Sequence, residues 1–144
     1  MALKFQVTFD CAGPDALARF WAEALGYELQ DPPEGFDTWG AYLASVGVPE
    51  DEWDTGSSIV DPEGVGARIY FQQVPEGKSA KNRLHLDVDV SRGRAAPLEE
   101  RRASVDEAVV RLAALGATKL YEASLDDHYA VTMQDPEGNE FCVR

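Results

Sequence analysis

The sequence has few cysteines and no long apolar run, and each shortage excludes a class of protein. Only Cys11 and Cys142 occur among the 144 residues, so the disulfide framework of a small secreted domain is excluded. No window approaches the roughly 18 uninterrupted apolar residues that a membrane-spanning helix needs. The first residues, MALKFQVTFD, also lack the basic region and apolar core of a secretory leader. We therefore expect a cytoplasmic protein whose two thiols are reduced.

Positive charge is scarce as well. Lysine and arginine number 13 against 26 aspartates and glutamates, which gives a formal net charge of −13. Such a charge repels nucleic-acid phosphates and anionic lipid headgroups, so we expect no nucleic-acid or membrane partner. With 44% apolar residues, the chain has the length and composition of one globular domain with a single core. Small molecules and other proteins remain as partners.

The first half of the chain opens with an alternating segment. Phe5, Val7 and Phe9 share one parity, which predicts a strand over 3–11 with one buried face. Apolar residues then recur at helical spacing over 14–25, and Gly26 ends that helix. Beyond it, the sequence predicts extended segments over 27–29 and 38–45, a long loop over 50–58, a strand starting at 59–60, a turn at 61–64 and a strand over 67–74.

The second half repeats this order. An alternating strand is predicted over 83–90, followed by a helix that opens on a Ser-Val-Asp-Glu capping box at 104–107 and ends at Gly116. Short strands are predicted over 119–122, 129–134 and 140–144. The turn sequence Asp-Pro-Glu-Gly begins at Asp61 in the first half and again at Asp135 in the second. We interpret both copies as structural β-turns.

An internal duplication of about 75 residues explains this repetition. It predicts an α+β fold of two tandem β-α-β-β-β units, at about 3–76 and 80–144, within a single domain spanning 1–144. The polar side chains of each first strand would line a cleft between curved sheets, and such clefts bind ligands. These residues are Gln6, Thr8 and Asp10 in the first unit and His85, Asp87 and Asp89 in the second.

Four motifs in this order carry a family resemblance. They are DALARFW at 15–21, RIYFQQVPE at 68–76, KNRLHLD at 81–87 and DPEGNEFC at 135–142. With them the chain resembles the vicinal oxygen chelate superfamily, which includes glyoxalase I, bleomycin-resistance proteins and extradiol dioxygenases. It is most similar to small glyoxalase-like proteins common in actinobacteria. The resemblance implies curved mixed sheets around a cleft and a homodimer.

The resemblance also implies a divalent metal such as Zn, Ni, Mn or Fe. Gln6 and His85 stand at positions where metal-using members carry ligands. Four residues after Gly138, however, the chain has Cys142 where the family has a glutamate, and Glu140 lies two residues too early, about 6.5 Å along a strand. A ligating Cys142 would favour zinc. Without a metal, Glu140 would have to act as an unaided base.

Two functions follow as hypotheses. The first is a glyoxalase-like lyase or isomerase acting on a small oxygenated metabolite, with His85 and Glu140 as catalytic residues. The second is a non-enzymatic protein that binds and sequesters a drug-like or metabolite ligand, as bleomycin-resistance proteins do. His85 could instead be a polar residue of the cleft, and Cys142 an inert one. The residues expected to contact the small molecule are Thr8, Tyr70, Gln72, Trp39 and Cys142.

Overall fold

A computed structural model describes residues 1–144. They form two compact units, Met1–Gly77 and Lys78–Arg144, and each is described by itself. That both units belong to a single domain stays a prediction. The first unit contains β1 (Val7–Cys11), α1 (Pro14–Leu25), β2 (Glu28–Leu29), α2 (Trp39–Ser45), the 3-10 helix η1 (Glu50–Thr55), β3 (Gly56–Val60) and β4 (Ile69–Gln73).

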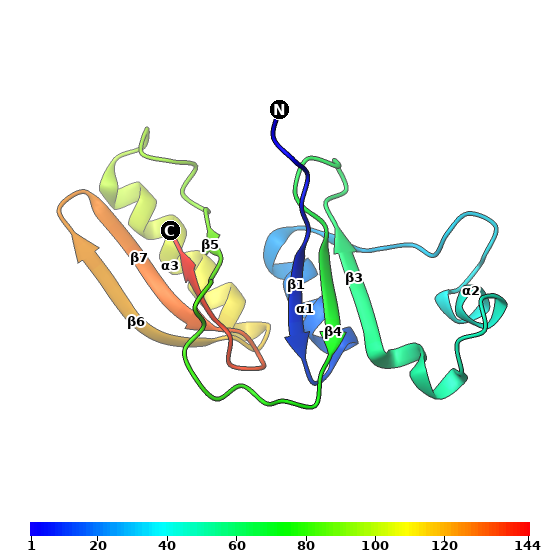
Figure 1. Cartoon of the computed structure of the whole chain (residues 1–144). Coiled ribbons are helices and arrows are strands. Elements are labelled where there is room, and N and C mark those ends of the chain that lie inside the picture. The colour runs from blue at the N-terminus through cyan, green and yellow to red at the C-terminus, as the bar shows by residue number, and fades with distance from the viewer. The chain divides into compact units, whose positions relative to one another are not determined.

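The first sheet has the strand order β1-β4-β3-β2, with β1 parallel to β4 and the other neighbours antiparallel. Helix α1 packs on one face of this sheet. Helix α2 lies apart from the sheet, in the long connection between β2 and β3 (Figure 1). The core forms where α1 meets the sheet: Trp21 is 1% exposed, and its ring centroid lies 5.3 Å from that of Phe9. Gly26 ends α1 as predicted, with a φ of 71° that suits glycine.

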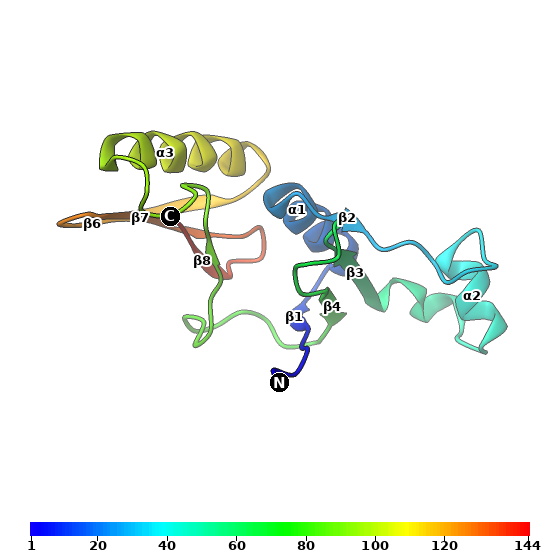
Figure 2. The ribbon, with the colours of Figure 1, turned by 90° about the horizontal axis from the view of Figure 1, so that it is seen from above.

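The second unit contains β5 (Asp87–Val88), α3 (Leu98–Ala114), β6 (Thr118–Leu125), β7 (His128–Gln134) and β8 (Glu140–Val143). Its sheet has the order β5-β8-β7-β6, again with a parallel pair, β5 and β8, beside antiparallel neighbours. Helix α3 lies across one face of this sheet (Figure 2). Val105, Leu112 and Val143 are buried there.

The two units share element order, strand order and strand direction, which confirms the α+β fold of two β-α-β-β-β units. The repeated Asp-Pro-Glu-Gly turns are also alike in detail. Asp61 accepts hydrogen bonds from the backbone N–H groups two and four residues later, and Asp135 does the same. Both aspartates therefore close their turns, as the sequence predicts. None of the helices combines the length and the apolar composition that spanning a membrane requires.

Two predictions for the first half are wrong. Residues 38–45, predicted as extended, form α2, because the Thr38 side chain caps the helix by accepting a hydrogen bond from Ala41 N at 3.0 Å. The predicted loop over 50–58 contains η1 and most of β3. Ser57 and Ser58 join the sheet despite their polarity, because β4 supplies backbone partners for them.

Two predictions for the second half are also wrong. Helix α3 begins at Leu98, after Pro97, so Ser104 is not a cap; its hydroxyl instead donates to the Glu100 carbonyl inside the helix. The strand predicted over 83–90 is confined to β5. This edge strand has only β8 as a neighbour, and backbone hydrogen bonds to the last residues of the chain extend the pairing only from Leu86 to Ser91.

Candidate functional site

A polar face of the first sheet lies opposite α1. On β4, Ile69 and Phe71 are buried towards the helix, so Tyr70 and Gln72 alternate onto the other face. Thr8 is the register partner of Tyr70 on the neighbouring β1 and shares that face. Three of the predicted ligand-contacting residues, Thr8, Tyr70 and Gln72, are thus brought together.

The Tyr70 hydroxyl lies over Gly56 on β3, which has no side chain to block it. A Cβ atom added at Gly56 would approach the hydroxyl oxygen to 2.5 Å. The glycine therefore leaves room for the tyrosine side chain on the polar face.

Gln6, predicted as a metal ligand, precedes β1 and is held by Arg68. Its Oε1 atom accepts a hydrogen bond from Arg68 Nη1 at 2.8 Å. A cation bound to this oxygen would lie beside the guanidinium and be repelled by it. Gln6 as a metal ligand stays a prediction, and this contact disfavours it.

Trp39 begins α2, and its side chain reaches the residue that follows β2. Its indole N–H donates to the Gln30 carbonyl at 2.8 Å, and its ring meets Tyr42 edge-on with centroids 5.9 Å apart. Phe36 contacts the other side of Tyr42 in the same edge-on manner. This aromatic cluster is anchored to Gln30, and Trp39 remains 36% exposed.

Three potential metal ligands meet in the second unit. The ligand atoms of His85, Asp87 and Cys142 all lie within 4.8 Å of one another. Asp87 on β5 is the register partner of Cys142 on β8, and His85 lies two residues before Asp87 on the same side of the chain. His85 Nε2 is 3.3 Å from Asp87 Oδ1.

The chemistry of this cluster fits zinc. Zinc in proteins is bound by imidazole, thiolate and carboxylate, and a tetrahedral ion places its ligand atoms roughly 3.5 Å apart. Cys142 is a free cysteine, half-buried, and its sulfur lies 3.5 Å from the Thr132 hydroxyl. Three protein ligands leave a fourth position open, as in catalytic zinc sites.

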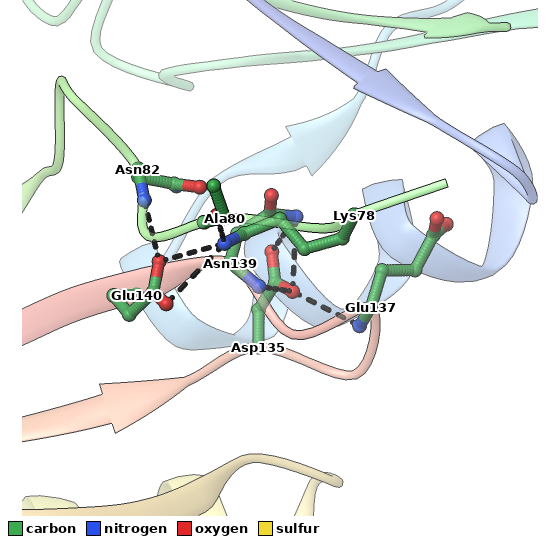
Figure 3. Close-up of polar contacts among 7 residues, drawn as sticks. All are labelled: Lys78, Ala80, Asn82, Asp135, Glu137, Asn139 and Glu140. Carbon is green, nitrogen blue, oxygen red and sulfur yellow. Dashed lines mark hydrogen bonds and ion pairs between the residues drawn. The ribbon is translucent and has the colours of Figure 1, made fainter. Parts of the chain in front are cut away.

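Glu140 lies at the start of β8, where two groups hold it (Figure 3). Its Oε2 accepts a hydrogen bond from the Asn82 backbone N–H at 2.9 Å and lies 3.1 Å from Lys78 Nζ. Mainly through the Asn82 hydrogen bond, with Lys78 adding to it, the pKa of Glu140 falls from 4.5 to about 2. Such a carboxylate is a poor proton acceptor at neutral pH. Its catalytic role stays a prediction, and these contacts disfavour it.

This arrangement predicts a pH-dependent effect of Glu140→Gln. The amide still accepts from Asn82 but loses the charge that faces Lys78, so we expect the free energy of unfolding at neutral pH to fall by about 1 kcal/mol. Because the folded-state pKa lies below the unfolded value, the stabilisation by Glu140 is complete above pH 4.5 and is lost as the pH falls towards 2.

Urea denaturation of wild type and variant, at neutral pH and at about pH 3, measures this difference. Glu63→Gln, which changes an exposed glutamate of the first Asp-Pro-Glu-Gly turn, is the matched control. A Glu140→Gln effect that is equal at both pH values would contradict the assignment.

Asp87 and Arg68 are the residues that the site analysis of the sequence missed. The sequence predicts Asp87 on the polar side of its strand. Its spacing of two residues from His85 is the signal that could have identified it as a second metal ligand. For Arg68 the sequence offers no such signal, because its partners come from three separate segments of the first unit.

Comparison with known proteins supports the family resemblance. The family model described as "Glyoxalase-like domain" matches residues 6–144, nearly the whole chain. Among curated proteins, no sequence relative matches the chain.

Solved structures show the same fold at low sequence identity. An enzyme of the glyoxalase/bleomycin resistance protein/dioxygenase family from Burkholderia phytofirmans is 18% identical, with a TM-score of 0.62 and coverage of 96% of this chain and 94% of that one. A possible glyoxalase from Bacillus cereus is 14% identical, with a TM-score of 0.61 and coverage of 99% and 97%. A mutant of the fosfomycin resistance protein FosX from Listeria monocytogenes, complexed with Mn(II) and 1S,2S-dihydroxypropylphosphonic acid, is 12% identical, with a TM-score of 0.63 and coverage of 100% and 90%.

Proposed function

The chain belongs to the glyoxalase-like domain family, and we propose that it binds a small oxygenated metabolite with the help of a zinc ion held by His85, Asp87 and Cys142. The observation that carries this proposal is the meeting of three different ligand types within 4.8 Å. The net charge of −13 also favours the uptake of a cation. The structural neighbour FosX, which contains Mn(II), supports the idea that this fold holds a divalent metal.

Zinc suits the ligand set better than manganese does. Imidazole and thiolate select zinc, whereas carboxylate, carbonyl and water oxygens suit manganese. When bound, zinc would supply Lewis acidity towards an oxygen atom of the ligand. This is the chemistry that a lyase or isomerase of the glyoxalase type requires.

The chain's own residues have separate roles in this proposal. His85, Asp87 and Cys142 bind the ion, and the Thr132 hydroxyl orients the Cys142 sulfur from 3.5 Å. Within the first unit, Thr8, Tyr70 and Gln72 present hydrogen-bonding groups on one polar sheet face, and we treat that face as a separate small-molecule surface. We include a homodimer in the proposal, as the family resemblance implies.

Titration calorimetry with the purified protein tests the metal. We expect one equivalent of zinc to bind, and to bind at least about 10-fold more tightly than manganese because of the thiolate. Binding should release protons, since a thiol must lose its proton to ligate. Absence of zinc binding, or equal affinity for the two ions, would overturn the zinc assignment.

Binding without catalysis is the second candidate function. The aromatic cluster of Phe36, Trp39 and Tyr42, with Trp39 partly exposed, favours a ligand with an aromatic body. The ion pair of Glu140 with Lys78 also leaves no free carboxylate base at that position. Unchanged small molecules recovered after incubation with the zinc-loaded protein would favour this candidate.

A further inference from the structure

Arg68 connects all four strands of the first sheet near one end. Its guanidinium donates to Gln6 Oε1 at 2.8 Å, to Gln30 Oε1 at 2.7 Å and to Ser58 Oγ at 2.7 Å. Gln6 leads into β1, Gln30 follows β2 and Ser58 lies within β3, while Arg68 itself leads into β4. These contacts fix the position of a positive charge on the polar face of the sheet.

The charge of Arg68 has no acidic partner. Its three acceptors are neutral, although the chain contains 26 acidic residues. Asp10 and Glu28 alternate onto the same face, about 13 Å and 7 Å along their strands from Gln6 and Gln30, and neither pairs with Arg68. Ion pairs elsewhere in the structure include those of Arg19, Lys78, His85, Arg101, Lys119 and Arg144.

Arg68 also keeps unused hydrogen-bond donors. A guanidinium carries five N–H groups, and three of them serve the neutral acceptors. The remaining two can serve a carboxylate or phosphate, whose paired oxygens match the planar guanidinium. The Tyr70 ring centroid lies 5.7 Å from Arg68 Cζ, so an uncharged aromatic ring neighbours the charge on β4.

Gln30 joins this charge to the aromatic cluster. Its side chain accepts from Arg68, and its backbone carbonyl accepts from the Trp39 indole. A guanidinium and a partly exposed indole are therefore held by one residue. An anion with an aromatic body could contact both.

We propose that Arg68 is the anion-binding residue of the first unit and that the ligand is an aromatic carboxylate. The proposal rests on the proposed function in one respect, that a small molecule is what the protein binds. It does not depend on zinc, because every residue involved belongs to Met1–Gly77.

The test measures the binding of benzoate, of inorganic phosphate and of neutral benzyl alcohol by calorimetry, with zinc-loaded and zinc-free protein. We expect benzoate to bind at least about 10-fold more tightly than benzyl alcohol, since a charge-assisted hydrogen bond is lost with the neutral probe. Arg68→Gln should weaken benzoate binding about 10- to 100-fold. Arg68→Lys, which keeps the charge but not the paired donors, should weaken it less.

Arg19→Gln is the matched control, because it also removes one positive charge but from an exposed pair with Asp15 on α1. It should leave benzoate binding unchanged. Equal binding of benzoate and benzyl alcohol by the wild type would overturn the proposal, as would wild-type benzoate affinity in a folded Arg68→Gln. Phosphate bound as tightly as benzoate would overturn the aromatic part of the assignment.

The same experiment separates this proposal from the zinc assignment. If Arg68→Gln does not fold, two measurements still test the anion site. These are the benzoate and benzyl alcohol affinities of the wild type and the benzoate affinity of Arg68→Lys. Zinc binding without benzoate binding would refute the anion site alone. Benzoate binding by a protein that takes up no zinc would refute the zinc assignment alone.

Discussion

Trp21→Ala is expected to lower the free energy of unfolding by about 3 to 5 kcal/mol, the range for truncation of a large buried aromatic side chain. Trp21 is 1% exposed and joins α1 to the first sheet through a ring contact with Phe9, at 5.3 Å between centroids. Its ring also meets that of Phe20 on the same helix, at 5.4 Å. Alanine would leave a cavity at the junction of helix and sheet. Since small domains are stabilised by only about 5 to 15 kcal/mol, much of the stability would be lost.

Denaturant unfolding followed by circular dichroism measures this effect, and Trp39→Ala is the matched control. Trp39 is 36% exposed and contacts Tyr42 on α2, in the connection between β2 and β3. Its truncation should cost about 1 kcal/mol, mainly through the lost hydrogen bond to Gln30. Equal losses for the two variants would contradict a core placed between α1 and the sheet.

Cys142→Ala is expected to weaken zinc binding more than about 100-fold. Loss of a residue that merely orients a ligand already costs 10- to 100-fold in metal affinity, and loss of a direct ligand should cost more. The thiol also contributes to the preference for zinc over manganese, so the variant should show a smaller preference. His85→Ala and Asp87→Ala should weaken binding of both ions.

Competition with a chelator of known affinity measures these losses. His128→Ala is the matched control for His85, because His128 begins β7 and does not belong to the metal-ligand cluster. It should bind zinc like the wild type. Wild-type affinity in Cys142→Ala would remove the thiol from the site, whatever the other variants do.

Much of the fold can be predicted from the sequence because its signals are local. The alternation before Cys11, the helical spacing that ends at Gly26 and the repeated Asp-Pro-Glu-Gly turns each reflect contacts within a few residues. Local patterns wrongly predict an extended segment over 38–45. The residues form α2 instead, because the Thr38 side chain caps the helix. Strand lengths depend on neighbours, which explains why β5 is so short.

The candidate site is harder to predict because it depends on strand pairing. His85 and Asp87 have the same parity in the alternating segment, which the sequence alone reveals. That Cys142 lies beside them follows only from the parallel register of β5 and β8. Likewise, the neutral surroundings of Arg68 arise from three segments that only the folded sheet brings together.

Glu140 illustrates a further limit. Its place on the last strand, two residues before the position of the family's glutamate, made it a candidate base, but its basicity is set by Lys78 and the Asn82 backbone. Both lie about 60 residues earlier, in the segment before β5. Sequence spacing indicates where a carboxylate lies on a strand, whereas its basicity depends on the tertiary contacts that surround it.

Cobalt substitution tests the central claim most directly, because a cobalt ion bound by a thiolate has a characteristic near-ultraviolet charge-transfer absorption. Titration of Co²⁺ into the metal-free protein should raise this absorption to a plateau at one equivalent, and zinc should abolish it. Cys142→Ala should show no such band, whereas His128→Ala should match the wild type. A wild-type protein that binds cobalt without the thiolate band, or that binds none, would contradict a metal site formed by His85, Asp87 and Cys142.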